Sequence, residues 1–250
     1  MKVLILINKV GLGDCIIHLN YIHEISKKYE KPVSILAKEN TRAKDLFQDD
    51  PHIKEVITLD RLEDETGSHD GLNGFIKLIK DIKEKKFDKV FIFNSSVRYF
   101  LVCKFAGIKK IAQYPLFKKK GQHVVNTAKI FTENEIDKIV STQPKLFINQ
   151  DKILKAQKKM SLNYKYIVLG ISASGPTKRW EIKNFIKLSE KINQKFPSKF
   201  YLAAGKNDQP LINEISNSNI GSNCVSLNNL KINEMLPCLL YTSPSPRDLS

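Results

Sequence analysis

The residues best suited to bind a phosphorylated ligand lie in the segment 172–180, which consists of Ser-Ala-Ser-Gly-Pro-Thr-Lys-Arg-Trp. The segment follows an apolar run and precedes an amphipathic pattern that begins at Glu181, so we predict a strand, a polar loop and a helix in that order. A loop of small residues before a helix presents backbone N–H groups to an anion, and the two basic side chains add positive charge. This chemistry suits a diphosphate. The predicted phosphate-binding residues are Ser174, Thr177, Lys178 and Arg179.

A solvated loop is the alternative for this segment, with its basic side chains in contact with water only. Trp180, the one tryptophan of the chain, directly follows the basic pair. A tryptophan at the start of a helix can anchor a loop on the body of a domain and fix its geometry. The position of Trp180 therefore favours phosphate binding.

A second loop whose residues could do chemistry lies near the start of the chain. There Gly11-Leu-Gly-Asp14 follows the apolar run 2–8 and precedes a helical pattern. Gly11 and Gly13 allow a sharp turn and the close approach of a ligand. A dinucleotide-binding fingerprint would carry a third glycine where this chain has Ile16, so an NAD site is disfavoured. The spacing leaves two interpretations of Asp14 open. It is either a helix cap or a carboxylate at the mouth of a cleft that accepts a proton.

Asp208, in Gly205-Lys-Asn-Asp208, follows another predicted strand. Its carboxylate is suited either to accept hydrogen bonds from a ribose hydroxyl or to cap the helix that begins at Gln209. Pro210, in the first turn of that helix, favours the cap.

The formal net charge of the chain is +15 at pH 7 over 250 residues. That charge allows attraction to nucleic acid, anionic lipid headgroups or phosphorylated substrates, although a lysine-rich genome would give the same composition. Only 83–86 and 118–120 are dense enough to form patches. The segment Lys118-Lys-Lys120 is either a solvated loop or a contact for an anionic acceptor. Because no basic motif interleaved with aromatic residues is present, we predict no nucleic-acid partner.

No apolar run approaches the roughly 20 residues of a membrane span, and the N-terminus has the pattern of a buried strand rather than a signal peptide. The four cysteines form no C-x-x-C pair, which argues against a disulfide framework or a zinc site. Cys15 and His18 lie close together on a predicted helix, but no further ligands follow at a recognisable spacing. We predict a cytoplasmic protein that uses no metal and no cofactor.

Strands and helices alternate along the chain and position these loops. The predicted strands are 2–8, 32–37, 52–59, 89–93, 109–112, 166–171, 199–205 and 224–227. The predicted helices are one after Gly11, then 41–47, 75–84, 97–105, 122–132, 181–196 and 209–216. This alternation predicts parallel α/β sheets, with Gly107 as the C-cap of helix 97–105. The segment 60–74 is expected to be a surface loop, and the polar segment 133–160 is the predicted linker.

The last residues, 239–250, depart from the Lys-, Asn- and Ile-rich composition of the rest of the chain. They resemble the translated read-through of a sequencing adapter. We expect the native sequence to end near Pro237 or Cys238, and we exclude the remainder from fold reasoning.

The chain resembles glycosyltransferase family 9, the bacterial lipopolysaccharide heptosyltransferases. The resemblance covers about residues 1–237. It rests on the apolar first strand with Gly11-Leu-Gly-Asp14 and on Gly175-Pro-Thr-Lys-Arg-Trp180, with a weaker match in 202–208. The family carries a later Asp-x-Gly-x-x-His motif that this sequence lacks, so we expect weak donor binding and poor folding of the C-terminal half.

The resemblance implies a GT-B-type α/β fold, in which two Rossmann-like parallel-sheet domains face a cleft, here with the second domain incomplete. The expected divisions are an acceptor-side domain at 1–150, a partial nucleotide-sugar-binding domain at 161–237 and a foreign tail at 238–250. In the family pattern Asp14 matches the general base, with Gly11 and Gly13 in the active-site loop. Lys178 matches the residue that binds the donor phosphate, and Ser174 matches a hydroxyl that contacts the same diphosphate.

The activity implied by the resemblance is an inverting, metal-independent transfer of a sugar, typically a heptose, from an ADP-sugar donor. The implied acceptor is the lipopolysaccharide core, which would bring the protein into peripheral contact with the anionic inner membrane. A nucleotide-sugar-binding fragment without turnover is the alternative, because the later motif is missing.

Overall fold

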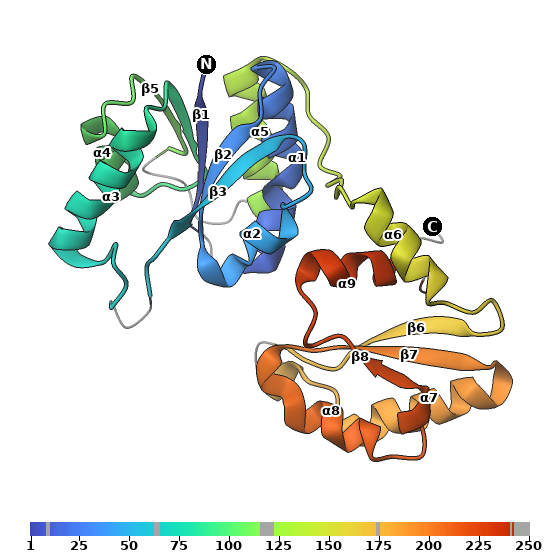
Figure 1. The fold of residues 1–250 in the computed structure, drawn as a ribbon. Helices are drawn as coiled ribbons and strands as arrows, with labels where there is room; N and C mark the ends of the chain where they lie inside the picture. The colour runs from blue at the N-terminus through green and yellow to red at the C-terminus, as the bar shows by residue number, and fades with distance from the viewer. Residues whose placement is uncertain (9–10, 63–65, 116–122, 174–175, 241, 243–250) are drawn as a thin grey trace. The chain divides into compact units, whose positions relative to one another are not determined.

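The computed structural model describes residues 1–8, 11–62, 66–115, 123–173, 176–240 and 242. The chain forms two compact units, Met1–Phe147 and Ile148–Ser250, and each unit is built on its own parallel sheet (Figure 1). Each sheet also has its own cluster of buried apolar side chains. The predicted α/β class with parallel sheets is therefore confirmed.

The first unit contains a five-stranded parallel sheet in the order β3-β2-β1-β4-β5. Its strands are β1 (Val3–Ile7), β2 (Val33–Lys38), β3 (Ile53–Leu59), β4 (Lys89–Ile92) and β5 (Lys110–Gln113). All five residues of β1 are buried, because β1 is the central strand and helices cover both faces of a parallel sheet. Ile5 of β1 lies opposite Ile35 of β2 and Phe91 of β4, which sets the register.

Helices cover both faces of this sheet (Figure 1). They are α1 (Leu12–Lys28), α2 (Ala43–Leu46), α3 (Gly71–Lys85), α4 (Val97–Phe105) and α5 (Val124–Ile136). α1 packs beside α5 on one face, and α3 packs beside α4 on the other. α4 is followed by Gly107 with φ of 83°, a left-handed conformation that favours glycine, so the predicted C-cap signal is confirmed.

The strand order places a topological switch point between β1 and β4. From β1 the chain runs outward through β2 and β3, and it then returns to β4 on the other side of β1. In open α/β sheets, ligands bind outside the carboxyl ends of the strands at such a point. The residues that follow β1 and β4 therefore border the expected binding edge of the first unit.

The second unit contains a three-stranded parallel sheet in the order β6-β7-β8. Its strands are β6 (Lys165–Gly170), β7 (Ser198–Ala203) and β8 (Cys224–Ser226), and its helices are α6 (Gln150–Lys158), α7 (Ile182–Lys195), α8 (Gln209–Ser216) and α9 (Ile232–Leu239). α7 and α8 pack together on one face, and α6 and α9 pack together on the other. No helix in the described part of the chain is long and apolar enough to cross a membrane.

The sequence did not predict α6 and α9. α6 lies within the polar segment that we expected to be a linker, and its only buried residue is Ala156. It packs against α9, which comes much later in the chain and buries Ile232. A helix that depends on such a distant partner carries only a weak local signal.

Candidate functional site

Asp14 lies in the first turn of α1, close behind the carboxyl end of β1. The N-cap of α1 is Gly11, and Asp14 Oδ2 accepts a hydrogen bond of 3.2 Å from the Gly11 N–H. Asp14 is half-buried, and its Oδ1 makes no hydrogen bond to any residue that the structure describes. The helix-cap interpretation thus needs correction, since Gly11 is the cap residue and Asp14 supports it from the third helical position. One carboxylate oxygen is thus held in place by a hydrogen bond, whereas the other has no such partner among the described residues.

Gly13 occupies an exposed helical position in which its own backbone needs no glycine. A Cβ added at Gly13 would meet nothing within 4 Å, whereas one added at Gly11 would lie 3.3 Å from Asp14 Oδ2. Packing among the described residues therefore accounts for a glycine at position 11 but not at position 13.

His18 stabilises the first turns of α1 from the buried side of the helix. Its ring is buried, with Nδ1 2.6 Å from the backbone oxygen of Asp14, and it lies edge-on to Phe93 with ring centroids 5.0 Å apart. Burial raises the pKa of the neighbouring Cys15 thiol to about 11, so this thiol is protonated at neutral pH. Among the described residues, no group of three or more His, Cys, Asp or Glu side chains is placed to hold a metal ion.

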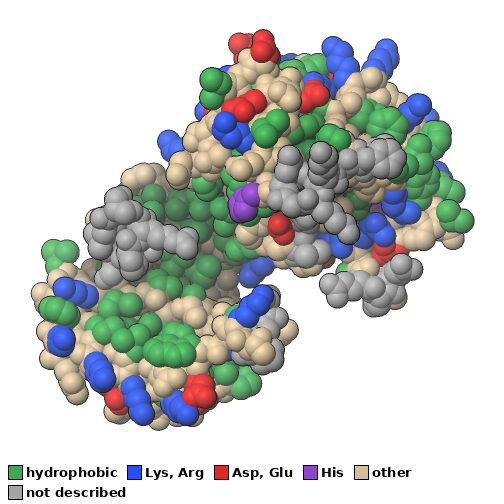
Figure 2. All heavy atoms as spheres, turned by 180° about the vertical axis from the view of Figure 1, so that it is seen from behind, with side chains coloured by type: hydrophobic (Ala, Val, Ile, Leu, Met, Phe, Trp, Pro, Cys, Tyr) green, Lys and Arg blue, Asp and Glu red, His purple; other side chains and the backbone are tan. Residues whose placement is uncertain are grey.

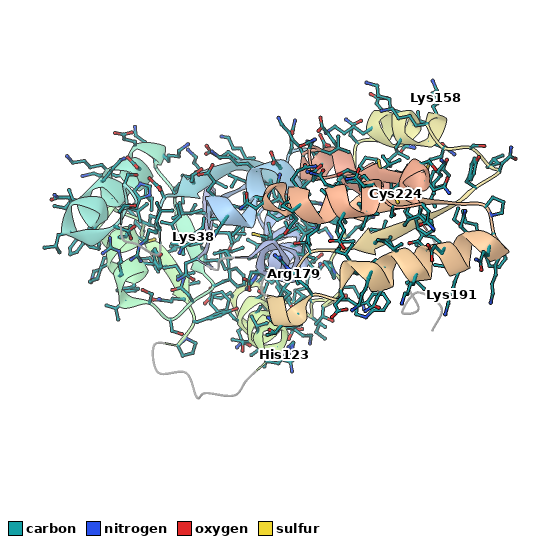
Figure 3. The ribbon with its side chains drawn as sticks, turned by 90° about the horizontal axis from the view of Figure 1, so that it is seen from below. Lys38, His123, Lys158, Arg179, Lys191 and Cys224 are labelled. Atoms are coloured by element: carbon teal, nitrogen blue, oxygen red, sulfur yellow. The ribbon has the colours of Figure 1, made fainter. Side chains whose placement is uncertain are left out.

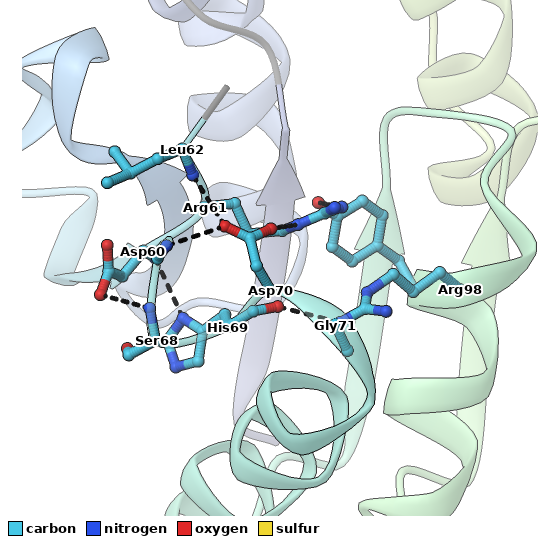
Figure 4. Close-up of polar contacts among 10 residues, drawn as sticks. Asp60, Arg61, Leu62, Ser68, His69, Asp70, Gly71 and Arg98 are labelled. Carbon is cyan, nitrogen blue, oxygen red and sulfur yellow. Dashed lines mark hydrogen bonds and ion pairs between the residues drawn. The ribbon is translucent and has the colours of Figure 1, made fainter. Parts of the chain in front are cut away.

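The loop that follows β3 is held by Asp70, a buried carboxylate (Figure 4). Asp70 Oδ1 accepts a hydrogen bond of 2.7 Å from Arg61 Nε, and Oδ2 accepts hydrogen bonds from the N–H groups of Leu62 and Gly67 at 3.0 and 3.1 Å. Burial opposes the charge, but these hydrogen bonds outweigh it and lower the pKa of Asp70. The sequence predicted only an irregular surface loop here and missed this network.

Two further contacts fix the same loop beside the switch point. Arg98 Nη2 donates hydrogen bonds to the carbonyl oxygens of His69 and Gly71 at 2.9 and 3.0 Å (Figure 4). His69 Nδ1 accepts a hydrogen bond of 3.0 Å from the Asp60 N–H. A hollow of about 130 Å³, lined in part by Asp60 and Arg61, lies at the ends of β2 and β3.

The predicted phosphate loop joins β6 to α7 in the second unit. Residues Pro176–Lys178 form one 3-10 turn, and α7 begins at Ile182 after the N-cap Glu181. Thr177 and Lys178 are exposed, and neither has an ion-pair or side-chain hydrogen-bond partner among the described residues. Ser174 and Gly175 lie outside the described residues, as do Lys118–Lys120.

Asp208 joins this loop to the one that follows β7. Its side chain is buried, with Oδ2 2.5 Å from the Ser172 Oγ that donates to it and 2.9 Å from the Gly205 N–H. Arg179 Nη2 donates to Asp208 Oδ1 at 3.2 Å. The hydrogen bond from Ser172 is the largest cause that lowers the pKa of Asp208, ahead of the opposing effect of burial. Asp208 occupies the N-cap position of α8, as the sequence favoured, but its side chain makes no hydrogen bond to that helix. Its Oδ2 instead completes the capping box of the 3-10 turn Lys206–Asp208, whose N-cap is Gly205.

Arg179 and Trp180 shape the end of the phosphate loop. Nε and Nη2 of Arg179 both donate to the Ala173 carbonyl oxygen at 3.3 Å, which closes the loop on itself. Trp180 packs edge-on against Phe185 of α7, with ring centroids 4.9 Å apart, and remains 50% exposed. Figure 3 shows Arg179 next to the start of this helix.

The predicted site residues thus fall into two groups. Gly11, Gly13 and Asp14 border the switch point of the first unit, while Thr177, Lys178, Arg179 and Asp208 border the strand ends of the second. The contact between Arg179 and Asp208 joins positions 29 residues apart. Nothing in either local motif signals this contact, because it depends on β6 lying next to β7.

The family model for glycosyltransferase family 9 (heptosyltransferase) matches residues 75–228. This match spans more than half of the chain and includes both the Asp208 loop and the Lys178 loop. No curated protein is similar enough in sequence to count as a relative.

Solved structures with the same fold include three glycosyltransferases. ADP-heptose lipopolysaccharide heptosyltransferase II of E. coli has a TM-score of 0.75 at 17% identity, covering 97% of this chain and 77% of that one. A family 9 glycosyl transferase from Veillonella parvula DSM 2008 has a TM-score of 0.74 at 14% identity, covering 96% and 74%. E. coli heptosyltransferase WaaC with ADP-2-deoxy-2-fluoro heptose has a TM-score of 0.66 at 11% identity, covering 97% and 81%. These likenesses show the GT-B class of fold.

Proposed function

The chain belongs to glycosyltransferase family 9, and from that premise we propose that it transfers a heptose from ADP-heptose to a lipopolysaccharide core acceptor. The first unit would serve the acceptor and the second the nucleotide sugar. The donor is suggested by E. coli heptosyltransferase WaaC, whose structure holds ADP-2-deoxy-2-fluoro heptose. The acceptor follows from the family and from the E. coli lipopolysaccharide heptosyltransferase II of like fold.

The observation that carries the proposal is the state of the Lys178 loop. Arg179 and Asp208 hold this loop through contacts within the protein, while Lys178 and Thr177 stay exposed and make no polar side-chain contact with described residues. A positive charge on a preorganised loop suits the diphosphate of a nucleotide sugar. Ser174 is proposed to contact the same diphosphate, and Arg179 to act mainly as the support of the loop.

Asp14 is the proposed general base. Its Oδ2 is oriented by the Gly11 N–H, and its Oδ1, which makes no hydrogen bond to a described residue, is proposed to take the proton of an acceptor hydroxyl. As the acceptor oxygen bonds to the anomeric carbon, the proton of the hydroxyl passes to Asp14. The bond from the anomeric carbon to the diphosphate breaks on the opposite face, so the configuration inverts.

The electron pair of the broken bond leaves with ADP, and negative charge grows on the diphosphate. Lys178, Thr177 and backbone N–H groups are proposed to stabilise that charge, which is the task a metal ion performs in other transferases. We therefore propose a metal-independent reaction, for which the first unit supplies the base and the second supplies the cationic loop.

Direct assay of the full chain tests the proposal. With ADP-heptose and heptose-deficient lipopolysaccharide, we expect release of ADP and a heptosylated product whose anomeric configuration, read by NMR, is opposite to that of the donor. EDTA should leave the rate unchanged. Binding of ADP without any transfer would assign the chain to the nucleotide-binding alternative, and retention of configuration would rule out the single displacement.

A further inference from the structure

The outer surface of α4 exposes large apolar side chains where a helix that covers a sheet is ordinarily polar. Tyr99, Val102 and Cys103 are the buried residues that face the sheet. On the opposite side, Val97 is 53% and Phe105 is 58% exposed. α4 also carries the exposed Lys104, so its outer side combines a basic side chain with two large apolar ones that the described chain leaves about half uncovered.

α3 extends this apolar surface. Leu72 is 82% and Ile76 is 52% exposed, and their spacing of one helical turn puts them on the same side of α3. The ring of Phe75 lies edge-on to that of Phe105, with centroids 6.4 Å apart, which joins the two helices across the surface. We call the exposed side chains Leu72, Ile76, Val97 and Phe105 the α3–α4 face.

Lysines surround the α3–α4 face. They are all exposed and comprise Lys77, Lys80, Lys83, Lys86, Lys104, Lys109 and Lys110. None of them forms an ion pair with another described residue. The exposed acidic residues nearby are Glu84 and Asp88, and Asp88 already accepts a hydrogen bond of 2.6 Å from the Lys2 N–H. Figure 2 shows hydrophobic side chains next to lysines and arginines along the edge of the first unit that carries these helices.

A hollow of about 650 Å³ adjoins this surface at the amino ends of β4 and β5. Lys83, Lys86, Lys109 and Lys110 line it, over a floor that includes Phe87. One carboxylate, that of Asp88, also lines the hollow, and it accepts the hydrogen bond from the Lys2 N–H. Four ammonium groups around an apolar floor can accommodate an anionic headgroup whose tail region is apolar. The hollow therefore adds a specific contact to the more diffuse charge of the surface.

We propose that the α3–α4 face docks on an anionic lipid bilayer, with its apolar side chains in the headgroup region and its lysines on lipid phosphates. The inference rests on the proposed function, since a lipopolysaccharide acceptor is anchored in such a bilayer. A second copy of the chain fits this face poorly, because a two-fold interface would bring the lysines of both copies together. A bilayer of this kind offers negative charge to the surrounding lysines and an apolar environment to the exposed side chains of the α3–α4 face.

Co-sedimentation of the full chain with vesicles tests the proposal. Vesicles of phosphatidylethanolamine and phosphatidylglycerol should bind the chain, pure phosphatidylcholine should not, and high salt should weaken binding. Each lysine near an anionic surface contributes about a fivefold change in partitioning, so Lys80→Gln/Lys83→Gln/Lys104→Gln should weaken binding about a hundredfold. Leu72→Ser/Ile76→Ser/Phe105→Ser should also release the chain.

The matched control carries Lys187→Gln/Lys191→Gln/Lys195→Gln on α7, where the three lysines are also exposed and Lys191 is labelled in Figure 3. It removes the same charge and should bind within about twofold of the wild type, because these lysines lie on the other unit. Equal loss in both lysine variants would show attraction by net charge alone and would overturn the proposal. Absence of wild-type binding to phosphatidylglycerol vesicles would overturn it as well.

Two further measurements separate the remaining outcomes. A lipid-free chain that is a dimer by light scattering, and becomes a monomer in the serine variant, would assign the face to a second copy and contradict the proposal. ADP affinity, measured by calorimetry, should be the same in the wild type and both surface variants. A wild-type chain that does not bind ADP would count against the proposed function, whereas the result of the vesicle experiment would still stand. If the serine variant does not fold, the lysine variant decides alone.

Discussion

Asp208 has a structural task that its sequence motif does not reveal. It receives hydrogen bonds from Ser172, Gly205 and Arg179, so the loops after β6 and β7 share one buried carboxylate. The contact with a ribose hydroxyl that the sequence also allowed remains a prediction. Both carboxylate oxygens are already engaged within the protein, which favours a positioning role.

Asp208→Ala should destabilise the second unit by about 1.5–3 kcal/mol at pH 7, because it leaves buried donors and the Arg179 charge without a partner. Denaturant unfolding followed by the fluorescence of Trp180, the one tryptophan of the chain, measures this change. Glu214→Ala, at an exposed position of α8, is the control and should change the stability little. Equal unfolding midpoints for wild type and Asp208→Ala would contradict this role.

The same comparison predicts a pH dependence. The folded pKa of Asp208 lies below its ordinary value, so the stabilisation is present above the unfolded pKa of about 3.9 and is lost as the pH falls through the folded pKa. The difference in unfolding free energy between wild type and Asp208→Ala should therefore stay constant from pH 5 to 7 and shrink below about pH 4. A difference that grows on acidification would refute the assignment.

Lys178→Ala should weaken donor binding without unfolding the loop, since no described residue pairs with its ammonium group. Loss of one charge-assisted contact to phosphate corresponds to about a tenfold to hundredfold rise in the Kd for ADP. Calorimetric titration with ADP measures it. Lys187→Ala, an exposed lysine of the same unit, is the control, and an unchanged Kd for Lys178→Ala would remove the lysine from the diphosphate site.

At the scale of elements, a substitution at the start of α1 should change stability and activity in opposite directions. Gly13 is exposed and helical, and a methyl group there meets nothing. Gly13→Ala should therefore stabilise the first unit by about 0.5–1 kcal/mol, the usual gain for alanine over glycine in a helix. If the loop contacts a ligand, the same change should lower sugar transfer at least tenfold. A stabilised variant with full activity would show that Gly13 faces only solvent.

The loop after β3 depends on one buried carboxylate in the same way. Asp70→Ala leaves Arg61 and two backbone N–H groups without their acceptor, which should cost about 3 kcal/mol. Hydrogen exchange should show loss of protection at 61–62 and 66–71 in Asp70→Ala, whereas Glu84→Ala on the exposed side of α3 should leave the protection there unchanged. Unchanged protection in Asp70→Ala would mean that Arg98 alone holds the loop.

Most strands and helices could be predicted because their signals are local. The buried β1 and the amphipathic α7 each show their pattern within a few residues. α6 could not be predicted, because its apolar side depends on α9 far along the chain. The network around Asp70 was missed for another reason: its partners lie within nine residues, but an irregular loop has no repeating pattern that shows which of its side chains meet.

The candidate site could be predicted in part. Glycines and a carboxylate after β1, and a basic loop after β6, are visible as short motifs. The sequence did not show that the two adjacent basic residues of the second loop differ in their contacts. Arg179 follows Lys178 directly and carries the same charge, yet only Arg179 reaches Asp208. Which of two adjacent cations is open to a ligand depends on that distant partner.

At the scale of the whole molecule, the proposed reaction assigns a base to the first unit and a cationic loop to the second. The corresponding residues are Asp14 and Lys178. Asp14 is expected to affect the chemical step alone, because its proposed task is to take the proton of the acceptor hydroxyl. Lys178 is expected to affect donor binding, because its proposed contact with the diphosphate exists in the ground state as well as in the transition state.

The most direct test is the kinetics of Asp14→Asn with ADP-heptose and a lipopolysaccharide acceptor. Asparagine can still accept the Gly11 N–H but cannot take a proton at neutral pH. We predict that kcat falls about 10²- to 10⁴-fold, while the Kd for ADP stays within about twofold of the wild type. An Asp14→Asn enzyme with the full rate of sugar transfer would contradict the account.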